Sequence, residues 1–135
     1  SMLPQVLCAE FFKRGYYPAH HKMLCDLYRQ RRDTMLACID EYFPAGTKHS
    51  FPDGGLFTWV ELPGDIDTAE LLKESTGDPE VNVAFVAGEG FFVGRTGQGR
   101  NCMRMSFGNN SPERIREGVM RLGKLIEKKM AQQSK

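Results

Sequence analysis

A β-strand is predicted for the segment Gly99-Arg100-Asn101-Cys102-Met103-Arg104-Met105-Ser106-Phe107. Side chains in a strand alternate between its two faces. One face of this strand receives three large apolar side chains, those of Met103, Met105 and Phe107. That face therefore belongs to a hydrophobic core. Arg104 lies on the opposite face between two small residues, where its guanidinium needs an anion or water as a partner. We expect Arg104 to form part of a binding site.

Three further strands are predicted upstream of this one. The clearest is Leu56 to Leu62, which is rich in aromatic and β-branched residues and follows the turn Pro52-Asp53-Gly54-Gly55. A short strand is expected at Thr47 to Phe51. Another is expected at Val81 to Val86, with alternate residues on one face.

Four helices are predicted from apolar residues spaced three and four apart and from capping residues. The first two are Leu3 to Lys13 and a long helix from about Ala19 to Tyr42. Asp67 caps the start of a short third helix, and Ser111 caps the last one. The resulting order is helix, helix, strand, strand, helix, strand, strand, helix. It predicts an α/β fold of the α+β type, in which helices pack on a small mixed sheet.

Length and charge limit the classes of function. A chain of 135 residues is expected to form one domain, spanning residues 1–135, in which Ser1 and Met2 resemble a cloning remnant. The net charge of +1 gives no overall field for nucleic acid or membrane. No apolar run approaches the roughly 20 residues that a membrane helix needs. We expect a cytoplasmic protein, and we interpret the run Arg29 to Arg32 as a solvated helix face.

Common catalytic and metal-binding motifs are absent from the sequence. The glycine-rich segment Gly94 to Gly99 precedes a strand instead of a helix, so it does not match a phosphate-binding loop. No serine lies in a Gly-x-Ser-x-Gly motif. His20 and His21 are interpreted as surface residues. The four cysteines fit no zinc template and are expected to be reduced, buried thiols; they are Cys8, Cys25, Cys38 and Cys102.

Four segments of the sequence resemble one known family, the class I/II aminotransferases of fold type I, which use pyridoxal phosphate. The segment from Pro52 to Pro63 resembles the family pattern P-x-G-G-x-F-x-W-x-x-L-P. The segment from Val83 to Phe91 resembles V-x-x-x-P-G-x-x-F, with Ala87 in place of the family's proline. The segment from Asn101 to Phe107 resembles N-x-x-R-L-x-F. Finally, Tyr28 to Asp33 resembles the Y-x-x-R-R-D that opens the family's small domain.

The resemblance extends from about Gln5 to about Met130 and implies the C-terminal, small domain of such an enzyme. It implies that Arg104 binds the α-carboxylate of the amino-acid substrate, because a guanidinium forms two parallel charge-assisted hydrogen bonds with a carboxylate. By similarity alone, Phe57 lies near the same pocket, although an aromatic residue in a strand fits the core equally well. No catalytic, cofactor-binding or metal-binding residue is assigned within this chain.

The rest of the active site is expected outside this chain. In the family, pyridoxal phosphate is bound mainly by the large domain, which carries the Schiff-base lysine, and the parent enzyme is a homodimer. The parent would transfer an amino group between an α-amino acid and a 2-oxo acid, while this fragment would be inactive alone. Residues 3–17 are expected to lead toward the large domain.

Other interpretations remain compatible with the residues. The fold also occurs as the effector-sensing half of transcription regulators and in pyridoxal-phosphate-dependent carbon–sulfur lyases. Without the resemblance, Arg104 fits a structural salt bridge equally well. A free-standing interaction module is a further alternative.

Overall fold

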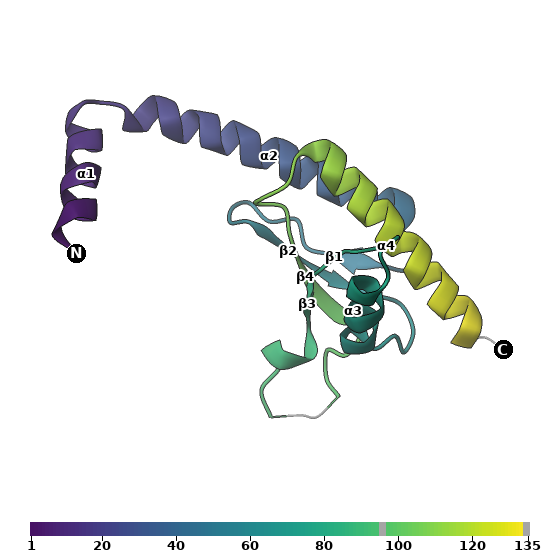
Figure 1. Ribbon diagram of the computed structural model, residues 1–135. Helices are drawn as coiled ribbons and strands as arrows, with labels where there is room; N and C mark the ends of the chain where they lie inside the picture. Colours follow the sequence, from purple (N-terminus) through teal and green to yellow (C-terminus); the bar gives the residue numbers. More distant parts are fainter. Residues whose placement is uncertain (95–96, 134–135) are drawn as a thin grey trace.

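The strand that contains Arg104 lies inside a four-stranded sheet in the computed structural model of the chain, which describes residues 1–94 and 97–133 (Figure 1). The strands follow the order β1-β2-β4-β3. Their bounds are Lys48–His49 for β1, Phe57–Glu61 for β2, Val86–Ala87 for β3 and Cys102–Ser106 for β4. All three strand pairings are antiparallel, whereas the sequence predicts a mixed sheet. The predicted combination of helices and a small sheet is confirmed.

The helices lie close to their predicted positions. They are α1 (Met2–Lys13), α2 (Tyr17–Tyr42), α3 (Thr68–Gly77) and α4 (Pro112–Gln133), and a 3₁₀ turn, η1 (Glu89–Phe91), follows β3. The predicted caps are present. Asp67 accepts hydrogen bonds from the backbone N–H groups of Ala69 and Glu70, at 2.8 and 3.3 Å. The Ser111 hydroxyl accepts one from the N–H of Arg114 at 3.4 Å.

The strand predicted at Val81 to Val86 is wrong for most of its length. Only Val86 pairs with a neighbouring strand, as part of β3. The reason lies at Asn82, whose backbone has a φ of 46° and whose N–H bonds to the carbonyl oxygen of Asp78 at 2.9 Å. A residue with positive φ cannot continue a strand. Val81 and Phe85 are nevertheless buried, so apolar packing and not sheet pairing explains their hydrophobicity.

The core lies between one face of the sheet and helices α2, α3 and α4. Met103, Met105 and Phe107 are buried there, as predicted from their alternation along β4. The same cluster contains the apolar stripe of α4 and the C-terminal half of α2. The two helices approach closely at Gly123, where any side chain would meet the backbone of Tyr42. Glycine at that position therefore permits the crossing of α2 over α4.

The basic run of α2 is less solvated than predicted. Arg29 is exposed, but Arg31 and Arg32 are half-buried. The Arg31 guanidinium donates a hydrogen bond of 2.5 Å to the carbonyl oxygen of Gly108, just after β4. The Arg32 guanidinium donates one of 3.1 Å to the carbonyl oxygen of Pro52. These two arginines therefore attach α2 to the loops at one end of the sheet.

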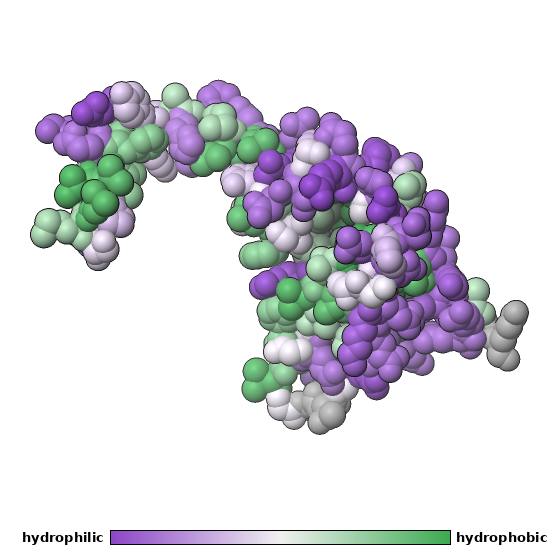
Figure 2. Space-filling view, viewed as in Figure 1, coloured by the Kyte–Doolittle hydropathy of each residue, from purple (hydrophilic) through white to green (hydrophobic). Residues whose placement is uncertain are grey.

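Helix α1 and the start of α2 form an arm that extends away from the sheet (Figure 1). No residue of α1 is buried. Apolar side chains gather along α1 in Figure 2, and the exposed ones include Leu3, Val6, Leu7 and Phe12. Cys8 is exposed on this arm and Cys25 is partly exposed, so only Cys38 and Cys102 are buried as predicted. Within residues 1–94 and 97–133, no helix has both the length and the apolar character needed to cross a bilayer.

Candidate functional site

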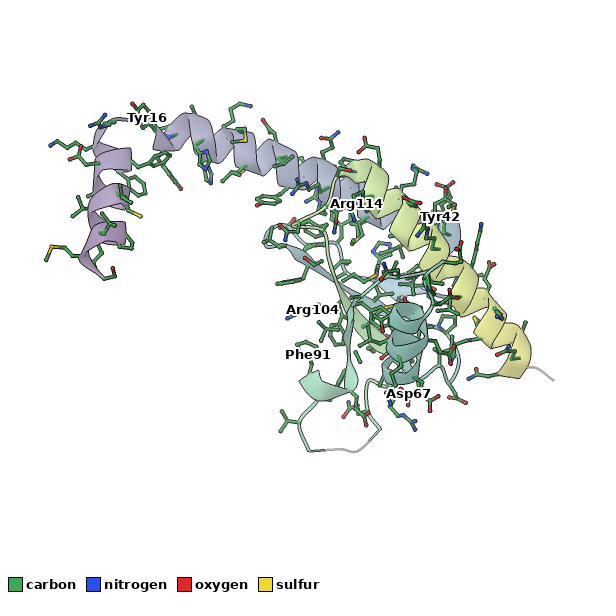
Figure 3. The ribbon with its side chains drawn as sticks, viewed as in Figure 1. Tyr16, Tyr42, Asp67, Phe91, Arg104 and Arg114 are labelled. Atoms are coloured by element: carbon green, nitrogen blue, oxygen red, sulfur yellow. The ribbon has the colours of Figure 1, made fainter. Side chains whose placement is uncertain are left out.

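Arg104 lies at the centre of the sheet, on the face opposite the core. Its Cα pairs with that of Trp59 in β2 and with that of Val86 in β3. Its neighbours in β4, Met103 and Met105, point into the core, so the period-two alternation directs Arg104 away from it. Figure 3 shows Arg104 on the side of the sheet away from α3 and α4, next to Phe91. The residue is half-buried.

Two aromatic rings lie against the guanidinium of Arg104. The centroid of the Phe57 ring is 4.2 Å from Cζ of Arg104, and that of the Phe91 ring is 5.1 Å from it. Both distances are within the range of a cation–π interaction. Phe57 comes from β2, and Phe91 comes from η1 after β3, so the rings approach from the two strands that flank β4. The Trp59 ring contacts Phe91 edge-on at 5.4 Å.

The guanidinium of Arg104 has no hydrogen-bond or ion-pair partner among the described residues. Its Nε is buried and makes no hydrogen bond. No carboxylate of residues 1–94 or 97–133 forms an ion pair with it. By contrast, Arg100 binds Asp67 at 2.5 Å. A buried donor left without an acceptor costs about 1–3 kcal/mol. The buried Nε is out of reach of a ligand, but the two Nη nitrogens are not buried and make no hydrogen bond among the described residues, so they can bind an anionic ligand.

Several hydrogen bonds fix the start of β4 and hence the position of Arg104. The amide of Asn101 donates to the carbonyl oxygen of Leu62 at 2.7 Å. The Thr68 hydroxyl, which is buried, donates to the carbonyl oxygen of Cys102 at 2.7 Å. The N–H of Gly88 donates to the same carbonyl oxygen, also at 2.7 Å. These bonds attach the end of β2, the start of α3 and the segment after β3 to the backbone at Asn101 and Cys102, just before Arg104.

Two ionisable groups near this point have shifted pKa values. The hydrogen bond from Arg100 is the main reason that the pKa of Asp67 lies below its usual value, and the two backbone N–H bonds act in the same direction. Burial raises the pKa of the Cys102 thiol, which therefore stays protonated and is a poor nucleophile. Asp67 acts as a helix cap and ion-pair partner, and Cys102 as a packing residue.

The structure brings together the two residues that the sequence analysis assigns to substrate binding, Arg104 and Phe57. Phe57 is 46% exposed, so it is not the core aromatic that the alternative interpretation required. Their role in substrate binding stays a prediction. The sequence patterns do not assign Phe91 to the site, although it ends the second family-like segment. Its signal in the sequence was the pair of aromatic residues, Phe91 and Phe92, in an otherwise glycine-rich region.

Other candidate chemistry is weaker in the described part of the chain. No three His, Cys, Asp or Glu side chains gather there in a way that could hold a metal ion. His20 and His21 are exposed, as expected. A hollow of about 300 Å³ lies between α2 and the turn before β2, lined by residues such as Tyr28 and Gly54, but Arg104 does not line it. Residues Arg95 and Thr96 of the predicted glycine-rich loop lie outside the described residues.

The chain is similar to part of several aminotransferases. It is 37% identical to aromatic-amino-acid aminotransferase 1 of Thermococcus litoralis over 126 residues, which are 93% of this chain and 29% of the relative. The crystal structure of LysN, an α-aminoadipate aminotransferase from Thermus thermophilus, complexed with N-(5'-phosphopyridoxyl)-L-leucine, superposes with a TM-score of 0.82. It is 35% identical, and the match covers 96% of this chain and 32% of that one. No protein-family model matches.

A second kind of relative is also found. The chain is 26% identical to an uncharacterized HTH-type transcriptional regulator of Escherichia coli, over 93% of this chain and 26% of the regulator. The chain thus spans about 30% of the length of the relatives that it matches. The extent of these matches is consistent with a C-terminal small domain.

Proposed function

We propose that the chain is the C-terminal small domain of a fold-type I aminotransferase that uses pyridoxal phosphate, because nearly its whole length is similar to part of several aminotransferases. The parent protein transfers an amino group between an α-amino acid and a 2-oxo acid. The role of this domain is to bind the substrate's α-carboxylate through Arg104. The observation that supports this role is the guanidinium itself, which is half-buried and has no anionic partner among the described residues.

Arg104 orients the substrate as well as attracting it. Its planar guanidinium offers N–H groups in a fixed fork, and two parallel hydrogen bonds to a carboxylate fix both the position and the rotation of the bound group. A substrate held in this way presents a defined bond at Cα for reaction. A lysine at position 104 would supply the charge without the fork.

The described residues do not fit the cofactor as well as they fit a carboxylate. An amine that bonds covalently to the cofactor must be desolvated or otherwise activated. The described lysines are exposed, apart from Lys129, which is held in an ion pair with Glu74. We therefore assign the covalent and phosphate contacts of pyridoxal phosphate to the rest of the parent protein. The 135-residue chain alone should not convert amino acids when pyridoxal phosphate is added. Turnover by the isolated chain would contradict this assignment.

The exposed apolar residues of α1 support a large partner surface within the same protein. Isolated exposed apolar residues are common, but an unpacked apolar helix face is typical of an interface. We assign the exposed face of α1, with Leu3 and Leu7, to packing against the rest of the parent protein, which forms a homodimer. Leu7→Glu should leave the stability of this chain unchanged and weaken its assembly with the remainder when the two pieces are co-expressed.

The kinetics of Arg104 variants in the parent enzyme test the carboxylate assignment. Arg104→Lys should lower kcat/KM for α-amino acids about ten- to hundredfold, the effect of losing a hydrogen bond to a charged group. An amine substrate that lacks the carboxylate should be used equally well by both proteins. Arg121→Lys is the matched control, because Arg121 bonds to Glu117 on the surface of α4. Unchanged kcat/KM in Arg104→Lys would refute the assignment.

An effector-sensing half of a transcription regulator is the second candidate, and the similarity to the Escherichia coli regulator favours it. In that case Arg104 binds an amino acid that is not converted. Measuring 2-oxo acid formation by the parent protein separates the two functions. Release of ammonia and a thiol or sulfide, instead of amino-group transfer, would identify a carbon–sulfur lyase. A helix-turn-helix segment encoded upstream in the parent gene would support the regulator.

A further inference from the structure

Phe91 takes no part in the hydrophobic core, although it is a large aromatic residue. It lies in η1 and is 47% exposed, so burial does not explain its position. Its ring contacts are with the Arg104 guanidinium at 5.1 Å and with the Trp59 ring at 5.4 Å, where the two ring planes are 89° apart. The Trp59 ring thus packs perpendicular to a ring that lies against the arginine.

We propose that Phe91 and Phe57 form an aromatic clamp that holds the Arg104 guanidinium in the orientation in which it binds a carboxylate. Phe91 is then a positioning residue, which acts on the substrate through Arg104. The proposal rests on the carboxylate-binding role of Arg104 proposed above.

The clamp lowers the cost of binding in two ways. An arginine side chain is long and flexible, and it loses conformational freedom when it binds a ligand. Stacking against Phe57 and Phe91 removes part of that freedom before the ligand arrives. The Nε is also buried, so part of the guanidinium is already removed from water before a ligand arrives. Hydrogen bonds from the remaining N–H groups to a carboxylate are stronger when water is excluded.

The backbone before Phe91 fixes the position of the ring. Gly88 approaches β4 so closely that a Cβ atom at this position would lie 2.5 Å from the carbonyl oxygen of Cys102. The N–H of Gly88 bonds to that oxygen, and the N–H of Phe91 bonds to the carbonyl oxygen of Gly88 at 3.0 Å. The turn that carries Phe91 is therefore attached to the strand that carries Arg104. Glycine is required at position 88 for this close approach.

The chain offers a matched control for the removal of Phe91. The ring of Phe51 lies 4.8 Å from Cζ of Arg32, so it forms the same kind of contact with a different arginine. Phe51 is exposed, and its arginine bonds to the carbonyl oxygen of Pro52. Phe51→Leu removes an aromatic ring from an arginine without changing the surroundings of Arg104.

Steady-state kinetics of the parent holoenzyme test the clamp. Phe91→Leu should raise KM for an α-amino acid about fivefold, the size of a cation–π contact at a half-exposed site. The kcat should change less than about twofold, since bound substrate is still oriented by the two hydrogen bonds. Phe91→Tyr retains the ring and should restore KM. Phe51→Leu should leave KM unchanged, as should Phe91→Leu when the substrate is an amine without a carboxylate.

Two results would overturn the clamp while leaving the function of Arg104 intact. One is an unchanged KM in Phe91→Leu when Arg104→Lys does impair amino-acid use. The other is an equal rise in KM for the amino acid and for the amine, because Phe91 would then contact the substrate directly.

NMR of the 135-residue chain tests the geometry of the clamp independently of activity. The quantity measured is the chemical shift of the Nε–H proton of Arg104. The resonance is identified by its loss in Arg104→Lys. Ring currents from Phe57 and Phe91 should displace it from the position of a solvated arginine, and Phe91→Leu should move it back toward that position. If Arg104→Lys leaves the kinetics unchanged, the proposed function is refuted. In that case the contact between Phe91 and Arg104 is tested by the chemical shift of this resonance alone. An Nε–H resonance that does not move in Phe91→Leu would refute the clamp.

Discussion

The two faces of the sheet come from the same strands but differ in how fully their side chains are buried and hydrogen-bonded. On the core face, Val60 and Met103 are fully buried against helices, and the buried hydroxyl of Thr58 donates to the carbonyl oxygen of Ser50 at 3.0 Å. On the opposite face, Phe57 is half-exposed and the Nε of Arg104 is buried without a partner. Among the described residues, the Nε of Arg31 in α2 is also buried without a hydrogen bond, but the Arg31 guanidinium is attached to the carbonyl oxygen of Gly108, whereas the Arg104 guanidinium has no such bond.

Because of this difference, we expect the core face to determine the stability of the domain and the Arg104 face to determine ligand binding. Apolar burial contributes roughly 25 cal/mol for each Å² removed from water, so the core face supplies most of the free energy of folding. The Arg104 face adds little, because its rings remain partly hydrated and its buried donor is unpaired. We therefore expect substitutions on the core face to affect unfolding and substitutions on the Arg104 face to affect ligand binding.

The largest effect on stability is expected for Phe107→Ala. Phe107 is 2% exposed in the core cluster, and truncating a buried phenylalanine costs about 3–5 kcal/mol because it loses apolar contacts and leaves a cavity. Phe91→Ala removes the same side chain from the Arg104 face and should cost less than about 1 kcal/mol. Urea unfolding followed by circular dichroism measures both. Equal destabilisation by the two variants would contradict the distinction between the faces.

A smaller loss is expected at Gly88, which joins the two faces. In Gly88→Ala the new methyl group collides with the backbone of Cys102, and overpacking of this kind costs about 1–3 kcal/mol. Gly90→Ala is a close control, since a Cβ at Gly90 meets no atom within 4 Å. Thermal unfolding of the two variants should differ accordingly. A stable Gly88→Ala protein would mean that η1 is not firmly attached to β4.

The core face could be predicted from the sequence, because it depends on local periodicity. The alternation of Met103, Met105 and Phe107 and the spacing of apolar residues in α4 identify buried side chains, whereas the spacing in α2 does so only for its C-terminal half. Periodicity failed at Val81 to Val86, where the backbone of Asn82 interrupts the strand and apolar residues pack without pairing. An apolar alternation thus predicts burial more reliably than it predicts a strand.

The surroundings of Arg104 could be predicted only in part. The sequence places Arg104 opposite the core, and the family-like segments add Phe57. The contact with Phe91 depends on the close approach of Gly88 to β4, which joins residues far apart in the sequence. The roles of Arg31 and Arg32 depend similarly on distant carbonyl groups. Such tertiary contacts leave no local periodic signal.

Arg100 and Arg104 lie four residues apart but differ in their partners. Of the two, Arg100 binds a carboxylate, that of Asp67, whereas Arg104 binds none among the described residues. The pKa of Asp67 is lowered by Arg100, so the unfolded chain binds the Asp67 proton more readily than the folded chain. The stability that Asp67 contributes is therefore complete above the ordinary aspartate pKa of about 3.9 and is lost as the pH falls through the lower, folded-state value.

Asp67→Asn should accordingly cost less than about 1 kcal/mol at neutral pH, because asparagine can still cap the helix and only the ion pair with the exposed Arg100 is lost. The difference from the original protein should shrink as the solution is acidified below the ordinary pKa of aspartate. Urea unfolding at a series of pH values measures this, with Asp65→Asn, at an exposed aspartate, as the control. A difference that grows on acidification would show that the Arg100 contact does not stabilise the folded state.

The smallest effect on stability is expected for Arg104→Met. Methionine has a similar length and can pack against Phe57 and Phe91, so the apolar contacts of the side chain are largely kept. The substitution also removes the Nε donor that is buried without an acceptor, which offsets the loss of the cation–π contacts. The free energy of unfolding should change by less than about 0.5 kcal/mol, as for a surface position. A loss above about 2 kcal/mol would identify Arg104 as a structural residue. A stable Arg104→Met domain that no longer supports amino-acid use in the parent enzyme would instead show that this arginine is retained for its ligand.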